Sequence, residues 1–416
     1  WTAVRAWGVA WKGSAAGAAF TGYTVDALYG CINGAALPVF ANGTMQNATS
    51  TGVVNAIKKV SALSGSVEPN QPTRGARSLT VELVDLGVAV TQMVKDFEMR
   101  NRVATLSVGY DDVDEADFVV LFKGRVSGLA YTDGVWKLSI GDLKRTLKTT
   151  VFSAAATTPV TFTAWNPIDL LLYLWSNGNY ADIDPALIDW ASIYAVRDSY
   201  FAALSMNFDI REPWELKSFT EEQLIGPLGC YLISTGAGLL TLKYVTTPVY
   251  ADKTGTVLSD VNIIGTPTIE YGLRDLLNEV FWEVDWDPVN QVYDDRTMYV
   301  DSDSLTEFQQ ATRLTVSSQG LASTDSVFIA ARNVRLFGRF SVPYPRYKVK
   351  AKLEMQTIHE GDVLQLSHKT LPDVSTGSRG LAGAHIVECI SASVNLDQGY
   401  CEFELLDTPW SFSKTV

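Results

Sequence analysis

The residues best suited to chemistry are the carboxylates Glu283, Asp285 and Asp287, which alternate with aromatic side chains in FWEVDWD. Paired carboxylates flank the scissile bond in glycosidases, and tryptophan rings beside them would stack on sugars. In a β-strand, however, successive side chains point to opposite faces, so the acids share one face, and Trp282 and Trp286 share the other. A strand with one core face has the same pattern. We therefore predict a structural strand, with a non-catalytic carbohydrate-binding surface as the alternative.

The three histidines, His359, His368 and His385, lie near the end of the chain, close in sequence to Cys389 and Cys401. A zinc site needs three or four ligands that converge at about 2.0 to 2.3 Å, usually from close spacings such as C-x-x-C or H-x-x-x-H. Neither spacing occurs. On a strand, His385 and Cys389 would share a face but lie about 13 Å apart. We therefore interpret the histidines as structural residues near strand ends.

The acidic run from Asp111 to Asp117 resembles part of a calcium-binding loop. It lacks the glycine at the sixth position and the glutamate at the twelfth that an EF-hand requires, so a solvated turn explains it better. The motifs G-x-S-x-G, G-x-G-x-x-G and H-E-x-x-H are also missing, as is a phosphate-binding loop. We predict no catalytic residue, no cofactor and no metal site, and hence a protein that is not an enzyme.

The composition is that of an ordinary globular chain, with 47% hydrophobic and 19% charged residues. The formal net charge of −13 argues against nucleic-acid binding, because neutralising phosphates requires a basic surface. An acidic surface would instead let DNA pass without sticking. No apolar run approaches the roughly 18 residues that a membrane helix needs. The first residue is Trp1 rather than Met, which indicates a start that was trimmed or left out.

The four cysteines, Cys31, Cys230, Cys389 and Cys401, form no C-x-x-C spacing. The closest pair would flank a hairpin turn, with Cys401 opposite about Val394 and Cys389 about 16 Å farther along the strand. A disulfide needs Cα atoms within about 7 Å. Four free thiols indicate a chain that folds in a reducing cytoplasm.

The clearest element is a hairpin in VVLFKGRVSGLAYTDGVWKLSIGDL, residues 119–143. Asp133-Gly134 suits a two-residue type I′ turn, because both central residues must adopt positive φ. This turn fixes the register and gathers one apolar row on one side of the hairpin. The expected cross-strand pairs are Tyr131 with Trp136, Leu129 with Leu138, and Ser127 with Ile140.

The first strand of this hairpin, from about Val119 to Tyr131, is longer than the usual five or six residues. Gly124 and Gly128 stand where a long strand must bend or bulge. A bent long strand favours a barrel over a flat sheet. The side away from the apolar row carries our candidate interface residues, Lys123, Arg125 and Lys137.

Three segments of the chain differ in pattern, and we predict a domain from each. Residues 1–150 predict a first β-barrel, residues 151–255 an α+β insertion, and residues 256–416 a second β-barrel with a packed helix at 326–340. The predicted class is therefore α+β, mainly β, with an α+β insertion between two barrels.

Helix signals are strongest in the insertion. NPIDLLLYLWSN begins with the cap Asn166 and Pro167 and ends at Asn177-Gly178. We expect two more helices, one with Pro185 in its first turn and one broken near Gly226-Pro227, followed by a hairpin from CYLIST and LLTLKY. In the helix at 326–340 we expect arginines 332, 335 and 339 outside an apolar core face of Val327, Ala330, Ala331, Val334 and Phe337.

Several of these phrases resemble bacteriophage tail hub (baseplate hub) proteins. RSLTVELVDLGVAVTQMV, RVATLSVGYDDVDEADFVVLFKGRVSGL and WKLSIGDLKRTL resemble the first hub barrel, in which such strands end in an F-x-G-x-V hairpin and a short D-x-x-R-x-L segment. NPIDLLLYLWSN, EEQLIGPLGCYL and HEGDVLQLSHKTLPD resemble later parts of the same proteins. The resemblance touches most of residues 70–408, and its motifs are structural rather than catalytic.

The resemblance implies a structural virion protein: a homotrimer at the distal end of the tail, in which each subunit contributes two tube-like β-barrels to a pseudo-sixfold ring. The implied partners are the distal tail or tail tube protein, the tape measure protein and tail tip fibre or spike proteins. Genomic DNA would pass through the lumen during ejection without specific binding, and assembly would occur in the host cytoplasm. Some hubs of siphophages continue into cysteine-rich, fibronectin-like or fibre domains; since this chain stops at Val416, we expect those functions in other proteins.

A carbohydrate-binding, receptor-recognising tail tip protein is the alternative. The tryptophans discriminate between the two functions. In a hub we expect Trp136, Trp175, Trp190 and Trp282 to be buried, whereas a carbohydrate-binding protein would expose two or three tryptophans on one face.

Overall fold

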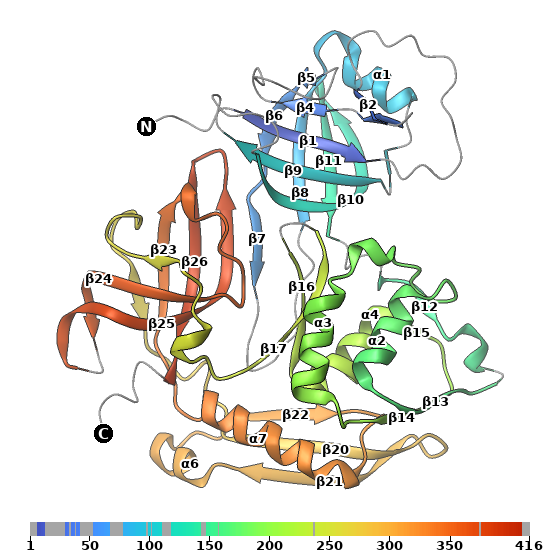
Figure 1. Cartoon of the computed structure of the whole chain (residues 1–416), viewed down its shortest axis with the longest axis vertical. Helices are drawn as coiled ribbons and strands as arrows, with labels where there is room; N and C mark the ends of the chain where they lie inside the picture. Colours follow the sequence, from blue (N-terminus) through green and yellow to red (C-terminus); the bar gives the residue numbers. More distant parts are fainter. Residues whose placement is uncertain are drawn as a thin grey trace.

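The computed structural model describes residues 6–12, 30–32, 35–37, 39–41, 53–66, 78–96, 99–100, 102–109, 118–142, 147–156, 158–235, 238–373 and 376–409. Of these residues, 44% are in strands and 26% in helices, and the large sheets are curled, which confirms the α+β, mainly β class. Figure 1 shows a barrel-like sheet, a second curled sheet, a helical lobe, and a smaller sheet covered by one long helix.

The first curled sheet has the strand order β5-β4-β1-β9-β10-β11-β8-β6. Its two edge strands, β5 and β6, follow one another in the chain with only Ala56 between them. The sheet therefore curls until its two edges meet, as in a barrel (Figure 1). The strands are β1 (Ala6–Lys12), β4 (Val39–Ala41), β5 (Val53–Asn55), β6 (Ile57–Val60), β8 (Ser78–Val84), β9 (Val103–Gly109), β10 (Val119–Thr132) and β11 (Val135–Gly141); α1 (Ala89–Asp96) and the pair β2 (Gly30–Ile32) and β3 (Ala35–Leu37) accompany them.

The hairpin of β10 and β11 forms as predicted near its turn. Asp133 and Gly134 have φ of 50° and 77°, as a type I′ turn requires. The pairs Tyr131 with Trp136 and Leu129 with Leu138 are confirmed.

The predicted pairing of Ser127 with Ile140 is wrong. Val126 faces Ile140 and Gly128 faces Ser139, so Ser127 is an extra residue in a β-bulge. A bulge places two residues of one strand opposite one residue of the other and bends the strand. Gly128 was predicted to permit such a bend, but the bulge also shifts the register by one residue.

The insertion is built around α2 (Pro167–Ser176). The Asn166 side chain accepts hydrogen bonds from the backbone N–H of Ile168 and Asp169, at 3.0 and 3.4 Å, which confirms the predicted cap. The other elements of this lobe are β12 (Thr150–Val151), β13 (Val160–Trp165), α3 (Trp190–Val196), β14 (Met206–Ile210), β15 (Trp214–Glu215), α4 (Leu216–Ser218), α5 (Gly226–Leu228), β16 (Cys230–Ser234) and β17 (Leu240–Tyr244).

Two helix boundaries in this lobe differ from the prediction. Pro185 starts a separate 3₁₀ turn, and α3 begins only at Trp190, where Asp189 caps it. The helix that was expected to break at Gly226-Pro227 runs from α4 through a π-helical segment to α5 and ends at Gly229. The widened π turn accommodates a proline whose missing N–H would interrupt an α-helix.

A three-stranded sheet has β20 (Glu279–Asp287) in its centre, with β21 (Val292–Val300) antiparallel and β22 (Arg313–Ser317) parallel to it. The helix α6 (Ser302–Phe308) lies between β21 and β22 in the chain. The helix α7 (Ser326–Phe340) has the predicted bounds and covers one face of the sheet (Figure 1). There the Trp282 indole N–H donates to the Asn333 side-chain oxygen at 2.8 Å.

The predicted orientation of α7 is wrong. Val327 and Val334, expected in the core, are 83% and 72% exposed, whereas Arg332 and Arg339 are 3% and 1% exposed. Arg339 Nη2 donates to Glu388 Oε2 at 2.5 Å in the second curled sheet. A buried charge is tolerated when it has a partner of opposite charge. Here the partner of Arg339 is Glu388, which lies 49 positions farther along the chain.

The second curled sheet has the order β18-β24-β25-β26-β23-β19. In the hairpin of β25 and β26, Cys401 faces Val394 as predicted, and Cys389 faces Leu405. Cys230, Cys389 and Cys401 are free, buried thiols. The strands are β18 (Val257–Leu258), β19 (Thr268–Glu270), β23 (Arg346–Lys352), β24 (Val363–Asp373), β25 (Ser378–Asn395) and β26 (Tyr400–Asp407).

Two consecutive strands join the curled sheets. β6 pairs with β8 in the first sheet, and β7 (Leu63–Ser66) pairs with β25 in the second. The strand ends Val60 and Leu63 are three residue steps apart, at most about 11 Å, so the sheets are held side by side. Their buried apolar side chains form one continuous core.

A second core unites the insertion with later residues. Buried apolar side chains from 277–340 pack in the same cluster as those from 147–245. This packing does not test the predicted domain boundaries, so the ranges 1–150, 151–255 and 256–416 stay a proposal. It does show that residues 277–340 pack against the insertion. No helix in the described part of the chain is long and apolar enough to cross a membrane.

Candidate functional site

The three candidate interface residues lie on the outer face of the first curled sheet. Lys123 and Arg125 are half-buried and alternate with the buried residues Phe122, Gly124 and Val126 along β10. Lys137 is exposed on β11, and its Nζ lies 3.5 Å from Glu82 Oε1 on the neighbouring strand.

Lys123 already has a neighbour within its own chain. A Cβ atom at Gly238, in the turn between β16 and β17, would overlap the Lys123 side chain. Gly238 has a φ of 74°, a conformation that glycine adopts readily. The insertion hairpin therefore docks on the outer face of the first sheet at Lys123, and the assignment of these residues to a subunit interface stays a prediction.

The carboxylates of β20 are engaged in structural contacts. Glu283 Oε1 lies 3.2 Å from Arg296 Nε, and Asp285 accepts from the backbone N–H of Ser323 at 3.2 Å. Backbone and side-chain hydrogen bonds from Asn290 hold the pKa of Asp287 below its usual value. Trp282, on the opposite face, is buried. These contacts agree with the structural strand that the alternation predicted.

The histidines lie in separate surroundings. His359 is half-buried at the edge of a cleft, and His368 Nε2 lies 3.1 Å from Asp260 Oδ1. In the part of the chain that the structure describes, no group of three or more His, Cys, Asp or Glu side chains could hold a metal ion. The acidic run Asp111 to Asp117 lies outside the described residues.

His385 sits in a buried acidic pocket of the second curled sheet. Its Nε2 lies 3.3 Å from Asp373 Oδ1, and its Nδ1 lies 3.5 Å from Asp407 Oδ2. The Tyr347 hydroxyl donates to the same Asp407 carboxylate at 2.8 Å. Burial alone would lower the pKa of His385, but the hydrogen bonds and charges of Asp407 and Asp373 outweigh it and raise the pKa above its usual value. This cluster ties β23, β24, β25 and β26 together.

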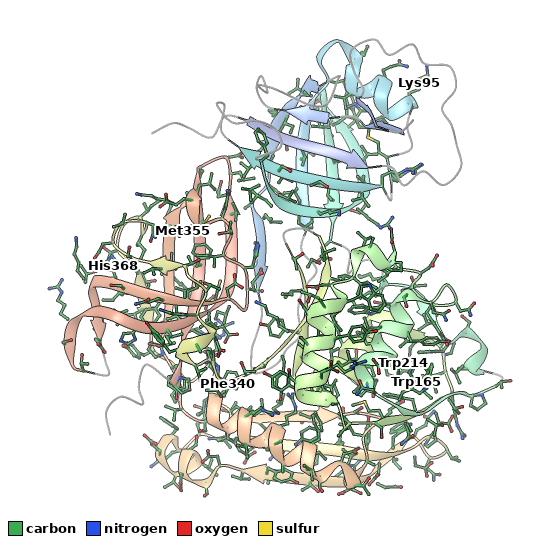
Figure 2. The ribbon with its side chains drawn as sticks, viewed as in Figure 1. Lys95, Trp165, Trp214, Phe340, Met355 and His368 are labelled. Atoms are coloured by element: carbon green, nitrogen blue, oxygen red, sulfur yellow. The ribbon has the colours of Figure 1, made fainter. Side chains whose placement is uncertain are left out.

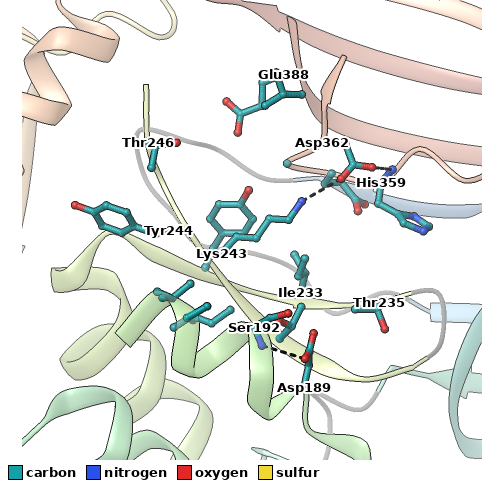
Figure 3. A pocket seen from close by; sticks show the side chains of 18 of the residues that line it. Asp189, Ser192, Ile233, Thr235, Lys243, Tyr244, Thr246, His359, Asp362 and Glu388 are labelled. Carbon is teal, nitrogen blue, oxygen red and sulfur yellow. Dashed lines mark hydrogen bonds and ion pairs between the residues drawn. The ribbon is translucent and has the colours of Figure 1, made fainter. Parts of the chain in front are cut away.

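A cleft of about 560 Å³ separates the helical lobe from the second curled sheet (Figure 3). Lys243 on β17 reaches across it, with its Nζ 3.1 Å from Asp362 Oδ1. Asp362 Oδ2 also accepts from the backbone N–H of His359 at 2.8 Å. Close by, a Cβ at Gly361 would overlap the Tyr231 hydroxyl, so the two lobes meet at this glycine. The ion pair bridges the cleft, and these contacts position the two lobes.

No local sequence pattern predicted the bridge between Lys243 and Asp362. Lys243 lies within β17, and Asp362 lies just before β24. Their pairing depends on how two distant segments pack.

Of the tryptophan side chains that the structure describes, two are buried and five are half-buried. Trp175 and Trp282 are buried as predicted, whereas Trp136 and Trp190 are half-buried. Trp165 and Trp214 are also half-buried and pack against the core of the helical lobe (Figure 2). None of the tryptophan side chains that the structure describes is fully exposed.

Among known proteins, only solved structures gave matches to this chain. No family model and no curated protein matches the sequence. A tail protein from Neisseria meningitidis MC58 matches 86% of this chain and 94% of its own, with a TM-score of 0.47 and 12% identity. The chain is similar to phage tail proteins.

Two prophage proteins match in the same way. The 43 kDa tail protein of prophage MuSo2 from Shewanella oneidensis has a TM-score of 0.46 and 12% identity, over 85% of this chain and 96% of its own. The prophage tail protein gp18 from Listeria monocytogenes EGD-e has a TM-score of 0.43 and 12% identity, over 85% and 90%.

Proposed function

We propose that this chain is a structural protein of a phage tail: a trimeric hub at the distal end, where the tail tube meets the tail tip or baseplate. One observation carries the proposal. A single chain holds two curled sheets side by side through the link of β6 and β7 and a shared apolar core. Three such chains would offer six curled sheets to a sixfold tube, and a closed ring would cover the sheet edges.

The hub would contact the tail tube or distal tail protein, the tape measure protein, and tip fibres or spikes. Lys123, Arg125 and Lys137 are the residues we assign to its subunit or tube contacts. The formal charge of −13 supports a lumen that lets DNA slide through during ejection without specific binding. The virion, at the distal end of the tail, is the proposed location.

A carbohydrate-binding tail tip protein is the second candidate function. It requires aromatic rings that are open to a sugar. The buried or half-buried tryptophans of the described residues favour the hub.

Antibody labelling tests the location. Gold-labelled antibodies against this chain should decorate intact virions only at the distal tail end, and a glycan array should show no binding. Labelling along the tube or on the capsid, or selective glycan binding by the isolated protein, would contradict the hub.

A further inference from the structure

The strand β22 forms an open edge of the sheet β21-β20-β22. Two hydrogen bonds fix how it meets β20: Glu279 N–H donates to Thr312 O at 3.0 Å, and Ser318 N–H donates to Glu283 O at 3.3 Å. In a parallel ladder, alternate residues of a strand turn both backbone groups toward one neighbour. These two bonds therefore identify which residues of β22 face β20.

Leu314 and Val316 turn their N–H and C=O groups toward β20, since they continue the alternation from Thr312 to Ser318. The residues between them turn their backbone groups away from β20. Within the described residues, β22 pairs with β20 and with no other strand. The edge therefore presents an unused row of donors and acceptors, at Arg313, Thr315 and Ser317.

A cleft of about 430 Å³ lies along this edge. Residues 314–317 of β22 form one wall, and residues 221–223 of the π-helical segment, with Gly226 and Pro227, form the other. An edge strand beside a groove is the arrangement to which extended peptides add as a further strand.

The accessible charges of the cleft are carboxylates. Glu222 is exposed and has no ion pair among the described residues, and Glu221 Oε2 lies 3.6 Å from Lys217 Nζ. The cation of the cleft, Arg332, is 3% exposed and donates to the carbonyl of Gly226 at 3.1 Å. The Arg332 guanidinium is thus bound to the backbone of α5. A ligand in the cleft would meet the carboxylates of Glu221 and Glu222.

We propose that β22 receives an extended, basic segment of another protein chain, which adds as a fourth strand beside Thr315 and places Lys or Arg side chains at Glu222 and Glu221. The backbone bonds would supply affinity, and the carboxylates would select the charge of the partner. This inference goes beyond the proposed tail function, because it rests on the sheet edge and cleft alone.

Binding of labelled peptides to the full chain, measured by fluorescence anisotropy, tests the proposal. The probes are four hexapeptides: one of alternating Thr and Lys, one of alternating Thr and Glu, and two Thr-Lys peptides in which alternate backbone nitrogens are methylated, one in each phase. We expect the unmodified Thr-Lys peptide to bind at least about tenfold more tightly than the Thr-Glu peptide and than the methylated form whose strand-facing N–H groups are blocked, a difference of about 1.4 kcal/mol.

Variants place the site on β22. Thr315→Pro removes an N–H that faces the cleft, a position where an edge strand tolerates proline, so we expect an affinity loss of about tenfold with the fold retained. Glu222→Gln should weaken binding about threefold and reduce its salt dependence, consistent with one lost surface charge pair. Glu354→Gln, which removes an exposed carboxylate from the 3₁₀ turn Leu353–Met355 after β23, is the matched control and should change nothing.

The proposal is overturned if the Thr-Lys peptide does not bind at about 1 mM, the weak end of specific recognition. Equal binding of the Thr-Glu peptide or of both methylated peptides also overturns it. Full affinity in a folded Thr315→Pro variant has the same consequence. If that variant does not fold, the methylated peptides still decide the outcome.

Discussion

Gly124 shows how a single residue fixes the shape of the long hairpin. A Cβ atom at this position would overlap the carbonyl oxygen of Gly141 on β11 and crowd the Phe122 ring. The backbones of β10 and β11 can approach this closely because Gly124 has no side chain. Gly128, at the bulge, has open space around its Cα.

Gly124→Ala should therefore destabilise the protein by about 1 to 3 kcal/mol, because the methyl group has no room and the strands must shift. Gly128→Ala is the matched control and should stay within about 1 kcal/mol, the cost typical of a change with no overlap. Urea unfolding followed by far-UV circular dichroism measures both. Equal stability of the two variants would show that the close approach at Gly124 does not constrain the hairpin.

His385 should make the stability of the second curled sheet depend on pH. Because its folded-state pKa is raised, its contribution is present in full below the pKa of an unfolded histidine, about 6.5, and is lost as the pH rises through the folded-state pKa. We expect the free energy of unfolding to fall over that interval and His385→Gln to remove this part of the dependence. The measurement is urea unfolding between mildly acidic and alkaline pH; an unchanged profile in the variant would contradict the charged cluster.

The helix α7 is anchored to the second curled sheet by the ion pair between its buried Arg339 and Glu388. Arg339→Met should cost about 3 to 5 kcal/mol, because it leaves Glu388 buried without its partner. Val334→Lys on the same helix should change stability by no more than about 0.5 kcal/mol, since Val334 is exposed. Urea unfolding of both variants tests the orientation of the helix. A larger loss for Val334→Lys than for Arg339→Met would restore the orientation that the apolar pattern predicts.

Capping and turn residues predicted where helices and strands begin and end better than the sequence pattern predicted which side of each element is buried. Asn166, Pro167 and the turn Asp133-Gly134 act within a few residues of themselves, so the bounds of α2 and the turn of the long hairpin followed from the sequence. The face of α7 did not, because the partner of Arg339 is a carboxylate 49 positions away. Periodicity records which side chains are apolar, and here it indicated the exposed side of the helix.

The candidate site was predictable only in outline. Alternation alone groups Lys123 and Arg125 with Leu129, and only the bulge at Ser127 turns both cations to the outer face of the first sheet. Alternation held no information about Gly238, whose approach to Lys123 depends on the docking of the insertion hairpin. The pair of Lys243 and Asp362 is likewise 119 positions apart in the chain.

At the scale of the whole molecule, the strands β6 and β7 are the central feature. They place one strand in each curled sheet within a few residues, so the sheets keep a fixed relation to each other. The two curled sheets share one buried apolar core, so they form a packed pair. The proposed hub uses this pair as two adjacent positions of a sixfold ring.

The mass and symmetry of the assembled particle test this central claim most directly. Native mass spectrometry should give three times the subunit mass of 45.5 kDa, and electron cryo-microscopy should show a closed threefold ring in which the two curled sheets alternate around a central channel. A stable monomer at physiological concentration, or a ring that leaves the curled sheets on its outside, would contradict the account.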